Sequence, residues 1–168
     1  ALARLVAGLK QRGLLDRINL IVLADHGMAS NPLPNSVLIE KLVPLDEVKT
    51  VSLGIVAGFN PKPGFDFAAI ERKLEQPQQH MRCWDKTRIP ARLHYGSNPR
   101  VPQLVCVADT GWRITTAASL ASHKGDSSIG EHGYDNADPR MRALVIAHGR
   151  AFQSGLLYAE FPNVEGYP

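Results

Sequence analysis

Five consecutive apolar residues, Leu20 to Ala24, end directly at Asp25, His26 and Gly27. An apolar run bounded by a glycine turn predicts a buried strand of a parallel sheet. In open α/β sheets, ligands bind at the carboxyl ends of the strands, where Asp25 and His26 stand. A carboxylate and an imidazole suit Zn²⁺, which accepts oxygen and nitrogen ligands. These residues alone leave two interpretations open: a metal site, or an aspartate that caps the next turn beside a surface histidine.

The rest of the chain alternates helical and strand patterns. Residues 1–13 carry apolar side chains at positions 2, 5, 6 and 9, which predicts a helix that packs on a sheet. Helix, short loop and strand form half of a parallel crossover unit, whose preceding strand is not in this sequence. A second helix is expected over 65–74, and further strands over 37–39, 51–57, 81–84, 104–108, 112–115 and 144–147. The expected fold class is α/β, with no clear domain boundary.

A second motif stands at residues 130–136, which read Gly-Glu-His-Gly-Tyr-Asp-Asn. It ends a long irregular stretch, and such loops inside compact domains are often functional. With the earlier Asp-His-Gly-Met it resembles the nucleotide pyrophosphatase/phosphodiesterase family of the alkaline phosphatase superfamily. That family carries a strand ending in D-H-G-M, and later G-x-H-G-Y-D-N followed by a Met, a strand and a G-P-A-F-like turn. The matching positions here are Met141, 144–147 and 149–152, and the segments 89–95 and 100–112 also resemble the family.

The resemblance implies an alkaline-phosphatase-like fold, a mostly parallel sheet flanked by helices, present here only in part. Residues 1–168 are expected to be the C-terminal portion of a single phosphodiesterase catalytic domain. The family binds two Zn²⁺ ions, which act together on a phosphodiester. By motif, Asp25 and His26 correspond to ligands of the ion that activates the nucleophile, and His132 to a ligand of the other ion. Without its motif, His132 is an ordinary loop histidine; Asp135 either orients a ligand imidazole or caps a turn.

The implied activity is hydrolysis of nucleotide phosphodiester or pyrophosphate bonds by in-line displacement. The family's nucleophile is a threonine in a T-x-x-N-type segment, and no threonine here has that context. We therefore expect no catalytic residue within residues 1–168, an N-terminal half that supplies the nucleophile and the remaining ligands, and an inactive isolated fragment. Alternatives are another hydrolase of the superfamily, acting on monoesters, sulfates or phosphonates, or a non-catalytic scaffold segment.

Charge and hydropathy bear on the partners. The net charge is +3 with a pI near 9.0, and the basic residues are scattered, so specific nucleic-acid recognition is not indicated. No apolar run approaches the length of a membrane span. The expected partner is a nucleotide or another small phosphodiester, and the family resemblance implies a periplasmic or extracellular location. The pattern gives no indication of oligomeric state.

The chain has two cysteines, Cys83 and Cys106. One disulfide is possible, but such a pair is more often two buried thiols. Neither cysteine has C-x-x-C spacing, so we expect packed thiols rather than zinc ligands. Trp112 and Tyr134 are expected to pack in the fold rather than stack on a base, and His80 is expected to be solvated.

Overall fold

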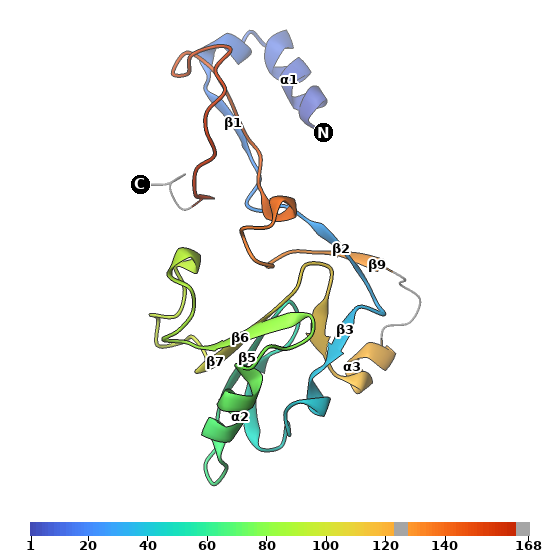
Figure 1. Ribbon diagram of the computed structural model, residues 1–168. Helices are drawn as coiled ribbons and strands as arrows, with labels where there is room; N and C mark the ends of the chain where they lie inside the picture. The colour runs from blue at the N-terminus through green and yellow to red at the C-terminus, as the bar shows by residue number, and fades with distance from the viewer. Residues whose placement is uncertain (123–127, 164–168) are drawn as a thin grey trace. The chain divides into compact units, whose positions relative to one another are not determined.

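The computed structural model describes residues 1–122 and 128–163, which divide into two compact units (Figure 1). The first unit combines Ala1–Gly27 with Arg142–Pro168, and the second is Met28–Met141. The expected single catalytic domain remains a prediction.

The first unit contains one α-helix and one antiparallel strand pair. Its elements are α1 (Leu2–Gln11), the 3₁₀ helix η1 (Leu15–Arg17), β1 (Leu20–Leu23) and β10 (Val145–His148). The predicted helix is confirmed: α1 ends at Gln11 with Arg12 as its C-cap, and Gly13 follows with φ +63°, a left-handed conformation that glycine adopts without strain. Strand β1 pairs with β10 from Leu20 opposite His148 to Leu23 opposite Val145.

Strand β1 differs from the prediction in its pairing and its burial. In the described residues its partner is antiparallel, and Ile21 and Leu23 are 58% and 60% exposed. Leu20 and Val22, which point to the other face, line an apolar cavity together with Leu2 and other side chains. An apolar run shows that a strand can be covered on both faces. An apolar run does not show which elements cover the strand. In this unit, only the face of β1 toward α1 is partly buried.

The second unit holds the remaining strands in three sheets. Strand β2 (Ala29–Pro32) pairs antiparallel with β9 (Ser128–Glu131), and β3 (Ser36–Leu38) pairs parallel with β8 (Arg113–Thr115). A four-stranded antiparallel sheet has the order β4 (Val48–Ser52), β5 (Val56–Pro61), β7 (Leu104–Ala108) and β6 (Met81–Asp85). The helices are η2 (Ile39–Lys41), α2 (Phe67–Leu74), η3 (Ala91–Leu93), α3 (Ala117–Ser122) and η4 (Pro139–Met141).

One predicted strand, 51–57, is in fact a hairpin. The chain turns at Gly54, whose φ of +139° is accessible to glycine, and strands β4 and β5 pair on either side of it. Helix α2 begins after Asp66, whose Oδ1 accepts a hydrogen bond from the Ala69 amide at 3.0 Å. This N-cap satisfies one of the amides that lack an intrahelical partner at a helix start.

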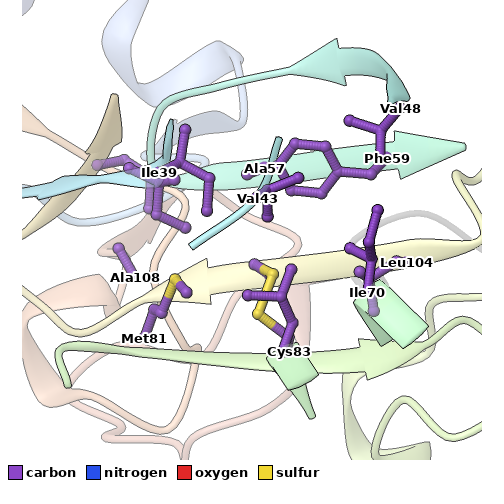
Figure 2. Close-up of a cluster of buried hydrophobic side chains, with 14 of the residues drawn as sticks. Ile39, Val43, Val48, Ala57, Phe59, Ile70, Met81, Cys83, Leu104 and Ala108 are labelled. Atoms are coloured by element: carbon purple, nitrogen blue, oxygen red, sulfur yellow. A yellow bond between two sulfur atoms is a disulfide. The ribbon is translucent and has the colours of Figure 1, made fainter. Parts of the chain in front are cut away.

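The core of the second unit lies between α2 and the four-stranded sheet (Figure 2). Helix α2 buries Phe67, Ile70 and Leu74, which the helical period places on one face. Phe59 and Leu104, from neighbouring sheet strands, are fully buried against them. Burial of this apolar surface stabilises the unit that carries His132.

The two cysteines form a disulfide, so the prediction of packed thiols is wrong. Cys83 and Cys106 are direct cross-strand partners in the β6–β7 ladder, within this core (Figure 2). Directly opposed residues have Cβ atoms about 4.5–5.5 Å apart, which brings two thiols within bonding reach. The register of two strands 23 positions apart decides this pairing, and spacing in the sequence does not reveal it.

The structure confirms the α/β class. Parallel pairing, which was expected to dominate, occurs here only between β3 and β8 among the strand pairs of the described residues. Within residues 1–122 and 128–163, every helix is too short or too polar to cross a bilayer.

Candidate metal centre

Asp25 and His26 follow β1 after Ala24, and hydrogen bonds to main-chain groups hold the chain there. The Ala24 amide donates to the Leu144 carbonyl at 2.9 Å, and the Asp25 carbonyl accepts from Asn163 Nδ2 at 2.7 Å. The side chain of Asp25 is 84% exposed. No backbone amide of residues 1–122 or 128–163 donates a hydrogen bond to its carboxylate, so no turn cap is formed within that part of the chain.

One ring nitrogen of His26 is held by the main chain. Nδ1 lies 2.7 Å from the Gly27 carbonyl oxygen. Because a carbonyl only accepts, this contact requires a proton on Nδ1, and in the neutral ring Nε2 then carries the lone pair. Metal-binding histidines typically donate one ring N–H to a carbonyl or carboxylate in this manner, which fixes the ring for ligation by the other nitrogen.

The two donor atoms are spaced as one zinc ion requires. His26 Nε2 and Asp25 Oδ1 are 3.5 Å apart. Zinc bonds of about 2.0–2.2 Å in tetrahedral geometry place two ligand atoms about 3.3–3.5 Å apart. This separation suits a shared Zn²⁺, and it is also that of a direct contact between the imidazole and the carboxylate.

His132 belongs to the second unit and follows β9. In the β2–β9 ladder, Ala29 lies opposite Glu131, so His132 is the first residue beyond the paired segment. A Cβ at Gly130 would lie 3.1 Å from the side-chain atoms of Met28, so glycine allows close packing there. His132 is exposed, and the next residue, Gly133, has φ +90°. The turn after His132 therefore needs a glycine.

A buried polar network holds this turn on one side. The hydroxyl of Tyr134, a residue only 5% exposed, accepts a hydrogen bond from Asn31 Nδ2 at 3.0 Å. Asn31 Oδ1 and its carbonyl accept from Arg113 Nε and Nη2 at 3.2 and 3.0 Å. Burial raises the pKa of Tyr134, partly offset by hydrogen bonds with Asn31 and the Gly111 backbone. Tyr134 is thus a packing residue, as predicted.

Asp135 holds the other side of the turn. Its Oδ1 accepts from the Ala137 amide at 2.9 Å, and both carboxylate oxygens accept from the guanidinium of Arg92. The Arg92 hydrogen bond is the main cause that lowers the pKa of Asp135. Of the two roles considered for Asp135, these contacts support the turn cap.

The predicted ligands are divided between the two units. Asp25 and His26 are brought together in the first unit, while His132 stands on a separately anchored turn of the second unit. Over residues 1–122 and 128–163, no group of three or more His, Cys, Asp or Glu side chains is close enough to hold one ion. The structure thus shows one adjacent Asp–His pair and one exposed histidine that follows β9.

Three anchoring residues, Asn31, Arg92 and Arg113, were not foreseen. The sequence contains a sign of the role of Arg113. A charged residue between Trp112 and Ile114 of an apolar strand is either exposed to solvent or buried with hydrogen-bond partners. His80, expected to be solvated, is half-buried and stacks on Trp112 with ring centroids 3.5 Å apart. Trp112 is a packing residue, as predicted.

Comparison with known proteins agrees with the motifs. A family profile described as "Type I phosphodiesterase / nucleotide pyrophosphatase" matches residues 1–135. Mouse bis(5'-adenosyl)-triphosphatase enpp4 is 32% identical over 164 residues, which cover 98% of this chain and 34% of the mouse protein. Human ectonucleotide pyrophosphatase/phosphodiesterase family member 5 is 30% identical over 99% of this chain and 34% of its own length.

Solved structures show the same relationship. Human ectonucleotide pyrophosphatase/phosphodiesterase 5 superposes with a TM-score of 0.77 at 31% identity, covering 89% of this chain and 38% of the human chain. An inactive variant of the murine protein, in complex with AMP, gives a TM-score of 0.75 at 33% identity over 88% of this chain and 38% of the murine chain. The chain thus spans about a third of the length of the relatives it matches.

Proposed function

Because the chain belongs to the type I phosphodiesterase/nucleotide pyrophosphatase family, we propose that the protein hydrolyses nucleotide phosphodiester or pyrophosphate bonds with two zinc ions. Asp25 and His26 contribute ligands to one ion and His132 to the other. The names of the relatives and the AMP complex of the murine neighbour support a nucleotide substrate. The observation that carries the metal assignment is the Asp25–His26 pair, whose donor atoms stand 3.5 Å apart with the His26 tautomer suited to ligation.

Each residue has a separate task in this proposal. Asp25 supplies a carboxylate, whose negative charge offsets that of the cation. His26 presents Nε2, because Nδ1 is held on the Gly27 carbonyl. His132 presents its imidazole from a turn that Tyr134 and Asp135 anchor. When bound, paired zinc ions stabilise the attacking and leaving oxygens of an in-line displacement.

Two further parts of the proposal concern residues and surroundings outside the site. We place the nucleophilic threonine outside residues 1–168, because no threonine of this chain lies in a T-x-x-N segment. We also propose a periplasmic or extracellular location. The Cys83–Cys106 disulfide supports an oxidising compartment, since disulfides rarely persist in the cytosol.

Hydrolysis of a nitrophenyl ester of a nucleotide tests the proposal. The assay uses the longest reading frame that contains residues 1–168, with and without added zinc, and compares nitrophenyl phosphate and nitrophenyl sulfate as substrates. Asp25→Asn, His26→Gln and His132→Gln should each lower kcat/KM for the diester by about 100-fold or more, since even residues that only orient metal ligands cost 10–100-fold.

His94→Asn is the matched control, because this exposed histidine has φ +46°, a conformation that asparagine tolerates. The control should keep activity within about threefold of the wild type, as surface substitutions usually have small effects. A diesterase unaffected by His26→Gln and His132→Gln, or a preference for the monoester or the sulfate, would contradict the proposal.

A further inference from the structure

Met28 is the exposed methionine of this chain. The sequence contains three methionines, and the structure describes all of them. Met28 is 56% exposed, whereas Met81 is 1% exposed in the core and Met141 is half-buried and packs against that core. Exposure largely decides which sulfur atoms a dissolved oxidant reaches. The structure therefore distinguishes one thioether from the other two.

The side chain of Met28 packs on a neighbouring strand of the second unit. Met28 directly precedes β2, which pairs with β9 from Ala29 opposite Glu131 onward (Figure 1). Its Cγ and Sδ both lie 3.1 Å from the position that a Cβ would take on Gly130. The thioether thus covers the main chain of β9 at a residue that has no side chain of its own.

This contact depends on an apolar sulfur. Methionine fills irregular contacts because its thioether is flexible, polarizable and apolar. Oxidation converts the thioether to a polar, chiral sulfoxide, which disrupts contacts that methionine makes. The sulfoxide oxygen is better solvated by water than by the carbon atoms of Gly130. We therefore expect oxidised Met28 to leave Gly130 and turn toward solvent.

We propose that Met28 is an oxidation site, at which a peroxide converts the thioether to the sulfoxide and thereby weakens the packing on β9. In this step the O–O bond of hydrogen peroxide breaks and one oxygen atom forms a bond to Sδ. The other oxygen leaves as water with both hydrogens. Sulfur loses two electrons and the peroxide gains them, so no further reactant is needed. Metal binding plays no part in this step.

The site is tested with hydrogen peroxide as the probe. The protein that carries this chain is treated with peroxide, and the gain of one oxygen atom at each methionine is followed by mass spectrometry of proteolytic peptides. We expect Met28 to react at least about tenfold faster than Met81 or Met141, because the reaction follows exposure. In the urea-unfolded protein the three rates should be similar, because the fold sets the order.

The structural effect is measured by hydrogen exchange of the amides in residues 29–32 and 128–131, which form β2 and β9. Peroxide should accelerate this exchange about threefold in the wild type, since the loss of one apolar contact weakens packing modestly. Met28→Leu keeps an apolar side chain of similar size without an oxidisable sulfur, so peroxide should not change its exchange. Met141→Leu is the matched control and should respond as the wild type does.

The inference would be overturned in either of two ways. If Met28 in the native protein reacts no faster than Met81 and Met141, it is not the oxidation site. If oxidation of Met28 leaves the exchange of β2 and β9 unchanged, or if peroxide accelerates that exchange equally in Met28→Leu, the thioether does not support the packing on β9.

Discussion

Replacing Asn31 by alanine should destabilise the second unit more than any surface change. Asn31 is fully buried and serves three partners: Nδ2 donates to the Tyr134 hydroxyl and, at 3.4 Å, to the Trp112 carbonyl, and Oδ1 accepts from Arg113 Nε. The alanine variant leaves Tyr134 and Arg113 in place but removes their common partner. Arg113 retains its bond to the main-chain carbonyl of residue 31.

The size of the effect follows from the groups left behind. A buried polar group that loses its partner costs about 1–3 kcal/mol, and a charged group costs more. The Tyr134 hydroxyl keeps its hydrogen bond with the Gly111 backbone. The loss of one of its two contacts and of one guanidinium contact then gives about 2–4 kcal/mol for Asn31→Ala. Tyr134→Phe removes the hydroxyl itself and leaves Asn31 its weaker contact with Trp112, so about 1–2 kcal/mol is expected.

Urea-induced unfolding followed by tryptophan fluorescence measures both changes, because Trp112 belongs to this network. Asn98→Ala, at an exposed asparagine that accepts one bond from the Arg100 amide, is the control and should cost less than about 1 kcal/mol. An Asn31→Ala variant no less stable than Asn98→Ala, or less destabilised than Tyr134→Phe, would refute the reasoning.

Three further outcomes follow from the same structure. Reduction of the disulfide, or Cys106→Ala, should lower the free energy of unfolding by about 3 kcal/mol for a link across 23 positions; two titratable thiols in the native protein would show that the bond is absent. The lowered pKa of Asp135, caused first by Arg92, means that the stability of this pair is present above pH about 3.9 and is lost as pH falls further. Acid titration of metal-free Asp135→Asn should therefore show a shallower loss than the wild type, and identical curves would contradict the pairing. Zinc content after dialysis should fall as the pH is lowered, because imidazole ligands must be neutral to bind; retention independent of pH would count against histidine ligation.

Local patterns predicted the elements of this fold well. The stripe at positions 2, 5, 6 and 9 predicted α1, and short apolar runs predicted β6, β7 and β8 to within a residue or two. These elements depend on side chains a few positions apart, and such spacing is visible in a sequence. The family resemblance was likewise confirmed, since it rests on two motifs in order.

Features of the fold that depend on long-range strand pairing were not predicted from the sequence. The sequence of β1 does not specify an antiparallel partner more than a hundred positions later, and it does not reveal that Ile21 is 58% exposed. The disulfide depends on the register between β6 and β7. The turn at Gly54 divides what the sequence predicted as one strand. A glycine within a strand pattern is ambiguous, because it can mark either a bend or a close approach of another backbone segment.

In the candidate site too, local motifs were identified from the sequence and long-range contacts were not. Asp25, His26 and His132 were identified by motif, and their role as zinc ligands remains a prediction. The residues that orient the His132 turn were not identified, because Arg92 and Arg113 reach their partners across 43 and 82 positions. Contacts of this kind are created by the fold.

Anomalous X-ray diffraction at the zinc edge, from crystals of the zinc-loaded protein that carries this chain, tests the central claim most directly. We expect two zinc peaks about 3.5–4 Å apart. One peak should lie about 2.0–2.2 Å from Asp25 Oδ1 and His26 Nε2, and the other at the same distance from a ring nitrogen of His132. Zinc peaks away from these three side chains, or a fully loaded protein in which His26 and His132 bind no metal, would contradict the account.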